Sequence, residues 1–205
     1  VRDFQDWSFI GSINGTCGIT LIAKRWALTS AECCLDIAGK WIHFGSLDIG
    51  NFATGTVVEP QNIFMHPDFS ERLLQNNVCV VELNKAVEYS ATLGPACLDT
   101  SGVKQSTPAD PFIGFIAGFG GEKLPLKQAP VAVIPEIDCK ISYGESSISK
   151  DQFCAGYSSG SVDACKSDAG GPFMTINKEA GQRKLSGIIS WSRGCGQAGR
   201  PAVYS

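Results

Sequence analysis

The sequence predicts an all-β protein made of two small antiparallel barrels, and three observations lead to this fold class. Short β-branched or alternating runs recur along the 205 residues, and clusters of Gly, Pro, Asn or Ser separate them. Gly is abundant at 23 residues while charged residues make up only 18%, a balance typical of strands and tight turns. No segment keeps a helical period beyond about three turns.

The predicted strands fall into two groups along the chain. GITLIA, WIHF, TGTVVEPQNIF and NVCVVEL come first, and FIGFIAGFG, APVAVI and KLSGIISW follow. Residues 96–111, rich in Ser, Thr, Pro and Asp, form the most linker-like stretch between them, so we expect one barrel half in residues 1–98 and the other in residues 99–205. Periodicity alone also fits a sandwich. Single helical turns are expected at Ala31–Leu35 and from Pro135-Glu136 onward.

The nine cysteines indicate disulfides rather than metal binding. Their spacings lack the paired grouping of a zinc site, and only two histidines, His43 and His66, are present, so we predict no metal and no cofactor. Disulfides place the chain in an oxidising, secreted, extracellular setting. The Asn14-Gly15-Thr16 sequon is a glycosylation acceptor that agrees with this setting. A net charge of -3 without a basic run argues against binding of nucleic acid. No apolar run in the sequence is long enough to span a membrane.

Three segments carry a resemblance to a known family. Residues 26–33 (WALTSAEC) resemble W-V-L-T-A-A-H-C, residues 76–83 (NNVCVVEL) are similar to N-D-I-A-L-L-x-L, and residues 163–172 (DACKSDAGGP) look like D-A-C-x-G-D-S-G-G-P. These are the ordered His, Asp and Ser segments of trypsin-like and chymotrypsin-like serine proteases. The resemblance implies two chymotrypsin-type β-barrels with the active site in the cleft between them.

The sequence departs from that family at each catalytic position. Glu32 stands at the base position, Asn77 at the orienting position and Ala169 at the nucleophile position. Alanine has no atom that attacks a carbonyl, and neither Glu32 nor Asn77 reproduces the imidazole–carboxylate pair. We therefore predict a degenerate, catalytically inactive homologue. The alternatives are a laboratory Ser→Ala change at residue 169 alone, or Ser167 as a displaced nucleophile without a base.

The resemblance also implies changes around the catalytic positions. Ser167 replaces the oxyanion-hole glycine, and a side chain there disfavours a positive φ. The position of Asp163 matches the acidic base of a specificity pocket. Wall residues larger than glycine are expected to narrow that pocket, either by neutral drift or by selected occlusion. The vestigial pocket is predicted to comprise Asp163, Ser190, Trp191, Ser192 and Ala202.

The family's disulfide pattern gives further expectations. It implies the bridges Cys17–Cys33, Cys139–Cys154 and Cys165–Cys195, and leaves Cys34–Cys79 as a plausible fourth. Cys97 then resembles the cysteine that links many protease domains to an N-terminal segment, with a buried free thiol as the alternative. Asp168 occupies the position that, in the family, pairs with the new N-terminus. Either the family's N-terminal residues are missing ahead of residue 1, or the domain is zymogen-like.

The sequence favours a non-catalytic binding protein, with protein partners in an extracellular protease or immune cascade, acting as cofactor, decoy or regulator. Clip-domain homologues of invertebrates, inactivated paralogues of parasitic mites and growth-factor-like vertebrate homologues share this design, and the motif changes alone do not choose among them. The alternatives are a polysaccharide- or lipid-binding module on a protease fold, or an inactivated form of an active trypsin-like peptidase.

Overall fold

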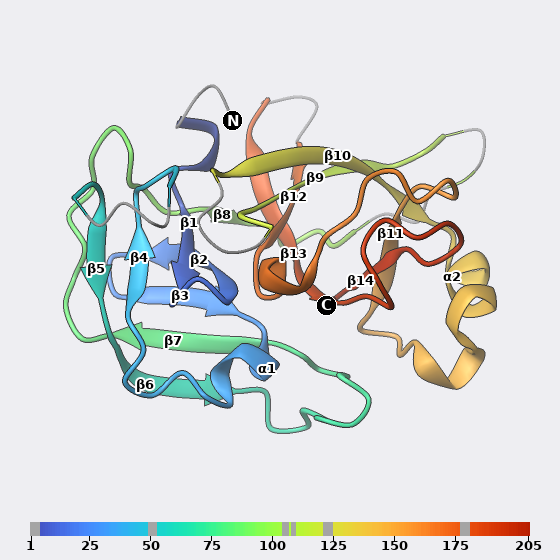
Figure 1. The fold of residues 1–205 in the computed structure, drawn as a ribbon, viewed down its shortest axis with the longest axis horizontal. Coiled ribbons are helices and arrows are strands. Elements are labelled where there is room, and N and C mark those ends of the chain that lie inside the picture. Colours follow the sequence, from blue (N-terminus) through green and yellow to red (C-terminus); the bar gives the residue numbers. More distant parts are fainter. Residues whose placement is uncertain (1–4, 49–52, 104–106, 108–109, 121–124, 177–180) are drawn as a thin grey trace.

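The computed structural model describes the chain except residues 1–4, 49–52, 104–106, 108–109, 121–124 and 177–180. Its described part contains two antiparallel, barrel-like sheets, which confirms the all-β, two-barrel prediction rather than a sandwich. In Figure 1 the blue-to-green strands β1–β7 lie on one side and the olive-to-red strands β9–β14 on the other.

The first sheet has the strand order β5-β4-β1-β2-β3-β7-β6. Inward-facing residues alternate with outward-facing ones along β7, as expected for a sheet with one buried face. Its strands are β1 (Ile10–Ile13), β2 (Cys17–Ala23), β3 (Trp26–Thr29), β4 (Ile42–Phe44), β5 (Thr56–Val58), β6 (Pro60–Met65) and β7 (Cys79–Leu83).

The second sheet has the order β12-β9-β10-β11-β14-β13-β8, and a further pairing of β12 with β13 closes its six long strands on themselves. The short β8 joins β13 in parallel, although it precedes the predicted boundary after residue 98. The strands are β8 (Cys97–Leu98), β9 (Ile113–Gly118), β10 (Lys127–Ile134), β11 (Phe153–Gly156), β12 (Pro172–Ile176), β13 (Arg183–Trp191) and β14 (Ala202–Tyr204).

Helical structure in the described residues is limited to short segments. The helix α1 (Ala31–Cys34) and the helix α2 (Glu136–Tyr143) lie where the sequence predicts them, and α2 packs at the outer edge of the second sheet (Figure 1). Single 3-10 turns are η1 (Gln5–Trp7), η2 (Glu145–Ser147) and η3 (Lys166–Asp168). Pro135 precedes α2, where a missing N–H costs nothing.

A three-residue connection, residues 14–16, joins β1 to β2. Asn14 and Gly15 have φ values of 51° and 75°, and the Thr16 N–H donates to the Ile13 carbonyl at 2.9 Å. Two consecutive positive φ values define the type I′ turn that Asn-Gly favours in hairpins. This turn lies at the end of the first barrel that faces the second.

Each sheet encloses its own apolar cluster. Phe44, Ile19 and Val81 are fully buried in the first, and Phe173 and Tyr204 are fully buried in the second. The first cluster extends across to Met174 and Leu185 of the second sheet, so the two halves share buried surface. Burial of this area supplies most of the stabilisation of such a fold, at about 25 cal/mol per Å² of apolar surface.

Candidate functional site

A cleft of about 460 Å³ is lined by residues of both halves, among them two of the three predicted catalytic positions, Glu32 and Ala169. The first half contributes the start of β2, the helix α1 and the loop before β7. The second half contributes the segment around η3 and the end of β13. The lining residues are Thr16, Cys17, Glu32, Cys33, Leu74, Ala164, Cys165, Ala169, Ile189, Ser190, Trp191 and Ser192.

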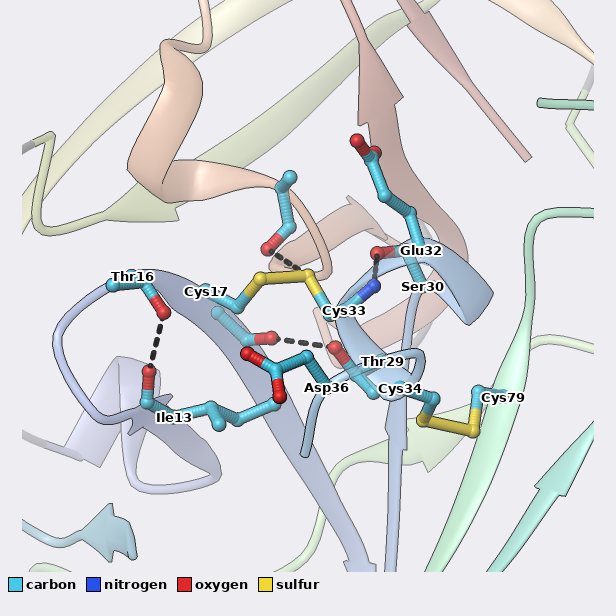
Figure 2. Close-up of a disulfide and its surroundings, with 12 residues drawn as sticks. Ile13, Thr16, Cys17, Thr29, Ser30, Glu32, Cys33, Cys34, Asp36 and Cys79 are labelled. Atoms are coloured by element: carbon cyan, nitrogen blue, oxygen red, sulfur yellow. Dashed lines mark hydrogen bonds between the residues drawn. A yellow bond between two sulfur atoms is a disulfide. The ribbon is translucent and has the colours of Figure 1, made fainter. Parts of the chain in front are cut away.

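The helix α1, which carries Glu32, is fixed on both sides. The Ser30 hydroxyl caps the helix by accepting the Cys33 N–H at 3.3 Å. Two disulfides leave consecutive residues of the helix, Cys17–Cys33 toward β2 and Cys34–Cys79 toward β7. Figure 2 shows the Cys17–Cys33 bridge to the left of the helix, the Cys34–Cys79 bridge below it, and the Glu32 side chain directed upward, away from both.

Asn77 links the two walls of the cleft through its side-chain amide. Its Oδ1 accepts the backbone N–H of Glu32 at 2.9 Å, and its Nδ2 donates to Ser190 Oγ at 2.8 Å. Asn77 is fully buried and Ser190 is 1% exposed, so water does not replace these bonds. The amide thus holds α1 of the first half against β13 of the second half.

Ala169 takes part in the structure through its backbone. Its carbonyl accepts the Gly18 N–H at 2.7 Å, which joins β2 to the segment after η3. The chains approach closely here, because a Cβ on Gly18 would lie 2.7 Å from the Gly171 backbone. The side chain of Ala169 is a methyl group that lines the cleft and offers no donor, acceptor or nucleophile.

Glu32 is an exposed carboxylate at the rim of the cleft. Its carboxyl group is partly desolvated, which raises the pKa above its ordinary value, and the nearby carboxylate of Glu71 raises it further. The Asn77 contact reaches the backbone of Glu32 and not its side chain. Glu32 is therefore an acidic group on one wall of the cleft.

The segment that faces α1 is organised by the buried carboxylate of Asp168. Its Oδ2 accepts the Cys165 N–H at 2.9 Å, and its Oδ1 accepts the Gly120 N–H at 2.8 Å. Ser167 lies inside the 3-10 turn η3 and is not among the residues with positive φ. The bonds of Asp168 to these two amides accompany the 3-10 turn η3, Lys166–Asp168.

The predicted pocket residues separate into different environments. Ser190, Trp191 and Ser192 line the cleft, whereas Asp163 lines a second cavity of about 330 Å³ together with Asp168. Ala202 is fully buried. Burial raises the pKa of Asp163, and bonds from the backbone N–H groups of Gly196, Ala164 and Ala202 oppose this rise. The carboxylate of Asp163 is thus surrounded by backbone donors.

Four disulfides are present, with the same pairings that the family resemblance implies: Cys17–Cys33, Cys34–Cys79, Cys139–Cys154 and Cys165–Cys195. Cys97 is free and exposed on β8, and its sulfur accepts a hydrogen bond from Gln182 Nε2 at 3.1 Å. The alternative of a buried thiol is therefore wrong, because β8 lies at the end of its sheet.

Sequence reasoning missed the loop that closes the cleft. Leu74 lines the cleft with a φ of 50°, and its carbonyl accepts Gln152 Nε2 at 2.8 Å. The neighbouring Asn76 N–H donates to Asp151 Oδ2 at 2.8 Å. The two bonds tie this first-half loop to the second half. A leucine with positive φ has no sequence signature, whereas Asn76, with a φ of 51°, is a residue type that tolerates it.

The described residues contain no group of three or more His, Cys, Asp or Glu side chains arranged to hold a metal ion. Among the helices of the described residues, none has the length and apolar character needed to cross a bilayer.

Two barrel-like sheets with a cleft between them, and the ordered motifs on both walls of that cleft, define a protein of the chymotrypsin-like fold class. A sequence model of the trypsin family matches residues 3–205. The chain therefore belongs to the trypsin-like serine protease family.

Three curated relatives illustrate the breadth of this family. The chain is 30% identical over 202 residues to the suppressor of tumorigenicity 14 protein homolog of Bos taurus and 30% identical over 199 residues to coagulation factor XI of Bos taurus. It is 33% identical over 201 residues to the atrial natriuretic peptide-converting enzyme of Mus musculus. Each match covers 92% of this chain but only 23%, 31% and 17% of the relative.

Proposed function

We propose that this domain is a catalytically inactive serine protease homologue that acts by binding proteins in an extracellular proteolytic cascade. The observation that carries the proposal is the side chain at residue 169, a methyl group in the cleft at the position that matches the family's nucleophile. An acyl-enzyme needs an attacking oxygen or sulfur, so the covalent route stops at its first step.

The opposite wall supports the same proposal. A general base must lie within hydrogen-bond reach of the proton that it removes. Glu32 is at the rim and its carboxyl group has a raised pKa, but residue 169 of the same cleft offers a methyl group and no hydroxyl from which a proton could be removed. Asn77 uses both ends of its amide for structural bonds and carries no charge to stabilise a cation.

A binding role is supported by what surrounds these positions. Disulfides, the Asn77 bridge and the loop around Leu74 hold the cleft in one shape. Rigid surfaces bind with a smaller loss of conformational entropy than flexible ones. One of the relatives is named as a coagulation factor, and from this resemblance we infer for this chain a protein partner in a proteolytic cascade.

The proposal is tested with the secreted protein purified from eukaryotic cells. It is incubated with Arg, Phe and Ala peptide esters and with a phosphonate active-site titrant, beside an active trypsin as the positive control. We expect ester hydrolysis no faster than in buffer and no covalent adduct by intact mass. Stoichiometric labelling would show that the domain is a peptidase and overturn the proposal.

A restored variant tests whether the three replaced catalytic side chains alone account for the proposed inactivity. The triple substitution Glu32→His, Asn77→Asp and Ala169→Ser restores the family's residues at all three positions. Because Ser167 remains inside η3, we expect the triple variant to stay at least about 100-fold below trypsin in ester hydrolysis, the usual magnitude for one lost oxyanion donor. Trypsin-like rates in the triple variant would show that the surroundings are intact.

The setting of the domain follows from the disulfides and is part of the proposal. Four bridges are expected to persist only in an oxidising compartment, which favours secretion. The exposed thiol of Cys97 is available for linkage to another segment. Non-reducing electrophoresis of material from its natural source tests this, since a linked segment separates from the domain only after reduction.

A further inference from the structure

The hairpin turn between β1 and β2 combines a modification motif with a position beside the cleft. Asn14, Gly15 and Thr16 form an N-linked acceptor sequon, and Asn14 is exposed at the tip of the turn. Thr16, two residues further on, lines the cleft. We propose that Asn14 carries an N-linked oligosaccharide that stands at the first-barrel rim of the cleft and limits the size of the ligands that enter.

The turn holds the acceptor in a defined place. The Asn14 N–H donates to the Trp41 carbonyl at 3.1 Å, and both the N–H and the hydroxyl of Thr16 donate to the Ile13 carbonyl at 2.9 and 3.1 Å. Cys17 then anchors the start of β2 through its disulfide to Cys33. An oligosaccharide on Asn14 is thus attached to a fixed point and not to a flexible loop.

Figure 2 shows Thr16 beside the Cys17–Cys33 bridge, which joins the turn to α1, the helix that carries Glu32. Thr16 and Glu32 both line the cleft. A glycan is large and hydrated, and it excludes bulky groups from its surroundings. Its attachment two residues from Thr16 therefore narrows the approach to the cleft for bulky protein surfaces, while a narrow loop of a protein partner and small molecules still enter.

The chemistry requires a donor that the secretory pathway supplies, an oligosaccharide linked to a polyprenyl pyrophosphate. The Asn14 Nδ2 forms a bond to the anomeric carbon of the first N-acetylglucosamine, and the bond from that carbon to the pyrophosphate oxygen breaks. The lipid pyrophosphate leaves with the bonding electron pair, and one amide proton passes to a base of the transferase. The transfer precedes folding, so the later hydrogen bonds of Thr16 do not oppose it.

The first measurement is the intact mass of the protein secreted from eukaryotic cells, before and after a peptide N-glycosidase. We expect a fall in mass for the wild type and for Thr16→Ser, which keeps the sequon. Asn14→Gln and Thr16→Ala lose the sequon and are expected to show no change. An unmodified wild-type protein would overturn the proposal, whatever the outcome of the hydrolysis assays.

The second measurement tests the effect on the cleft. Leu74→Cys places a thiol on another part of the cleft lining, and Cys97 on β8 is an internal reference outside the cleft. A bulky polyethylene-glycol maleimide is expected to label residue 74 several-fold more slowly with the glycan than in the Asn14→Gln background. The labelling rates of residue 74 with the small reagent N-ethylmaleimide, and the labelling rates of Cys97, are expected to be the same with and without the glycan. If the bulky maleimide labels residue 74 equally fast with and without the glycan, the proposed size limit is refuted.

Discussion

The two walls of the cleft are held by different kinds of interaction. On the first wall, two disulfides leave adjacent residues of α1, and a buried serine caps that helix. On the second wall, one disulfide fixes Cys165, and the turn that follows depends on two hydrogen bonds to the Asp168 carboxylate. The first wall is thus mainly covalent and the second mainly polar, so the two should respond differently to substitution.

The largest effect is expected from the first wall. Replacing Cys34 and Cys79 by serine opens a loop with a sequence separation of 45 residues. The chain-entropy relation for a loop of that length gives a loss of about 4 kcal/mol in the free energy of unfolding. Urea unfolding followed by tryptophan fluorescence measures it. The control Cys97→Ser, at an exposed thiol, is expected to stay within about 0.5 kcal/mol of wild type.

The second wall is tested by Asp168→Ala. The substitution removes the carboxylate that accepts the N–H groups of Cys165 and Gly120, and a hydrogen bond to a charged group contributes about 1.5–3 kcal/mol. We expect a loss of about 3 kcal/mol by the same unfolding measurement. Asp168→Asn keeps one acceptor oxygen and should lose less. A loss in Asp168→Ala that exceeds the disulfide variant would reverse the ranking of the two walls.

The contact between the walls is tested by Asn77→Ala. This change removes the acceptor of the Glu32 N–H and the donor to Ser190 Oγ, so we expect a loss of about 2 kcal/mol. Ser190→Ala removes only one of the two bonds and should cost about 1 kcal/mol. In the double variant, Asn77→Ala with Ser190→Ala, the bond between the two side chains is lost only once, so the loss should be smaller than the sum of the two single losses. Losses that add exactly would therefore contradict the bridge between α1 and β13.

The smallest effect concerns pH and the first wall alone. The pKa of Glu32 is higher in the folded chain than in the unfolded chain, so the folded chain holds the Glu32 proton more strongly. The free energy of unfolding therefore falls as the pH rises past the pKa of Glu32 in the unfolded chain. Glu32→Gln should match wild type at pH 3 and be a few tenths of a kcal/mol more stable at pH 7, since exposure screens the charge. Thermal unfolding measured over a series of pH values checks this. Glu71→Gln is expected to give part of the stabilisation that Glu32→Gln gives.

Much of the fold could be predicted because its signals are local. The helix at Ala31 follows a capping serine, and the helix at Glu136 follows a proline at a compatible position. The strand β1 was missed because its residues, IGSI, are all buried and show no alternation. The short β8 depends wholly on a partner about ninety residues away, β13, and has no signal of its own.

The site could be predicted less completely than the fold. Motif order places Glu32, Ala169 and Ser190 at one cleft, and the structure brings them together. Asp163 instead faces the second cavity, since the direction of a side chain after a turn depends on backbone dihedral angles that the sequence does not specify. The roles of Glu32, Asn77 and Ala169 as replaced catalytic residues, and the half boundary after residue 98, stay predictions.

The carbonyl of Ala169 bears on how freely this position can change in evolution. The bond from Gly18 to that carbonyl uses backbone atoms that every amino acid possesses. By contrast, a Cβ on Gly18 would lie 2.7 Å from the Gly171 backbone, and a Cβ on Gly171 would lie 2.8 Å from the Asp168 carbonyl oxygen, so neither glycine accepts a side chain unless the backbone moves. Selection for folding therefore constrains the two glycines more tightly than residue 169. The side chain at residue 169 can therefore be replaced during evolution while the fold around it is kept.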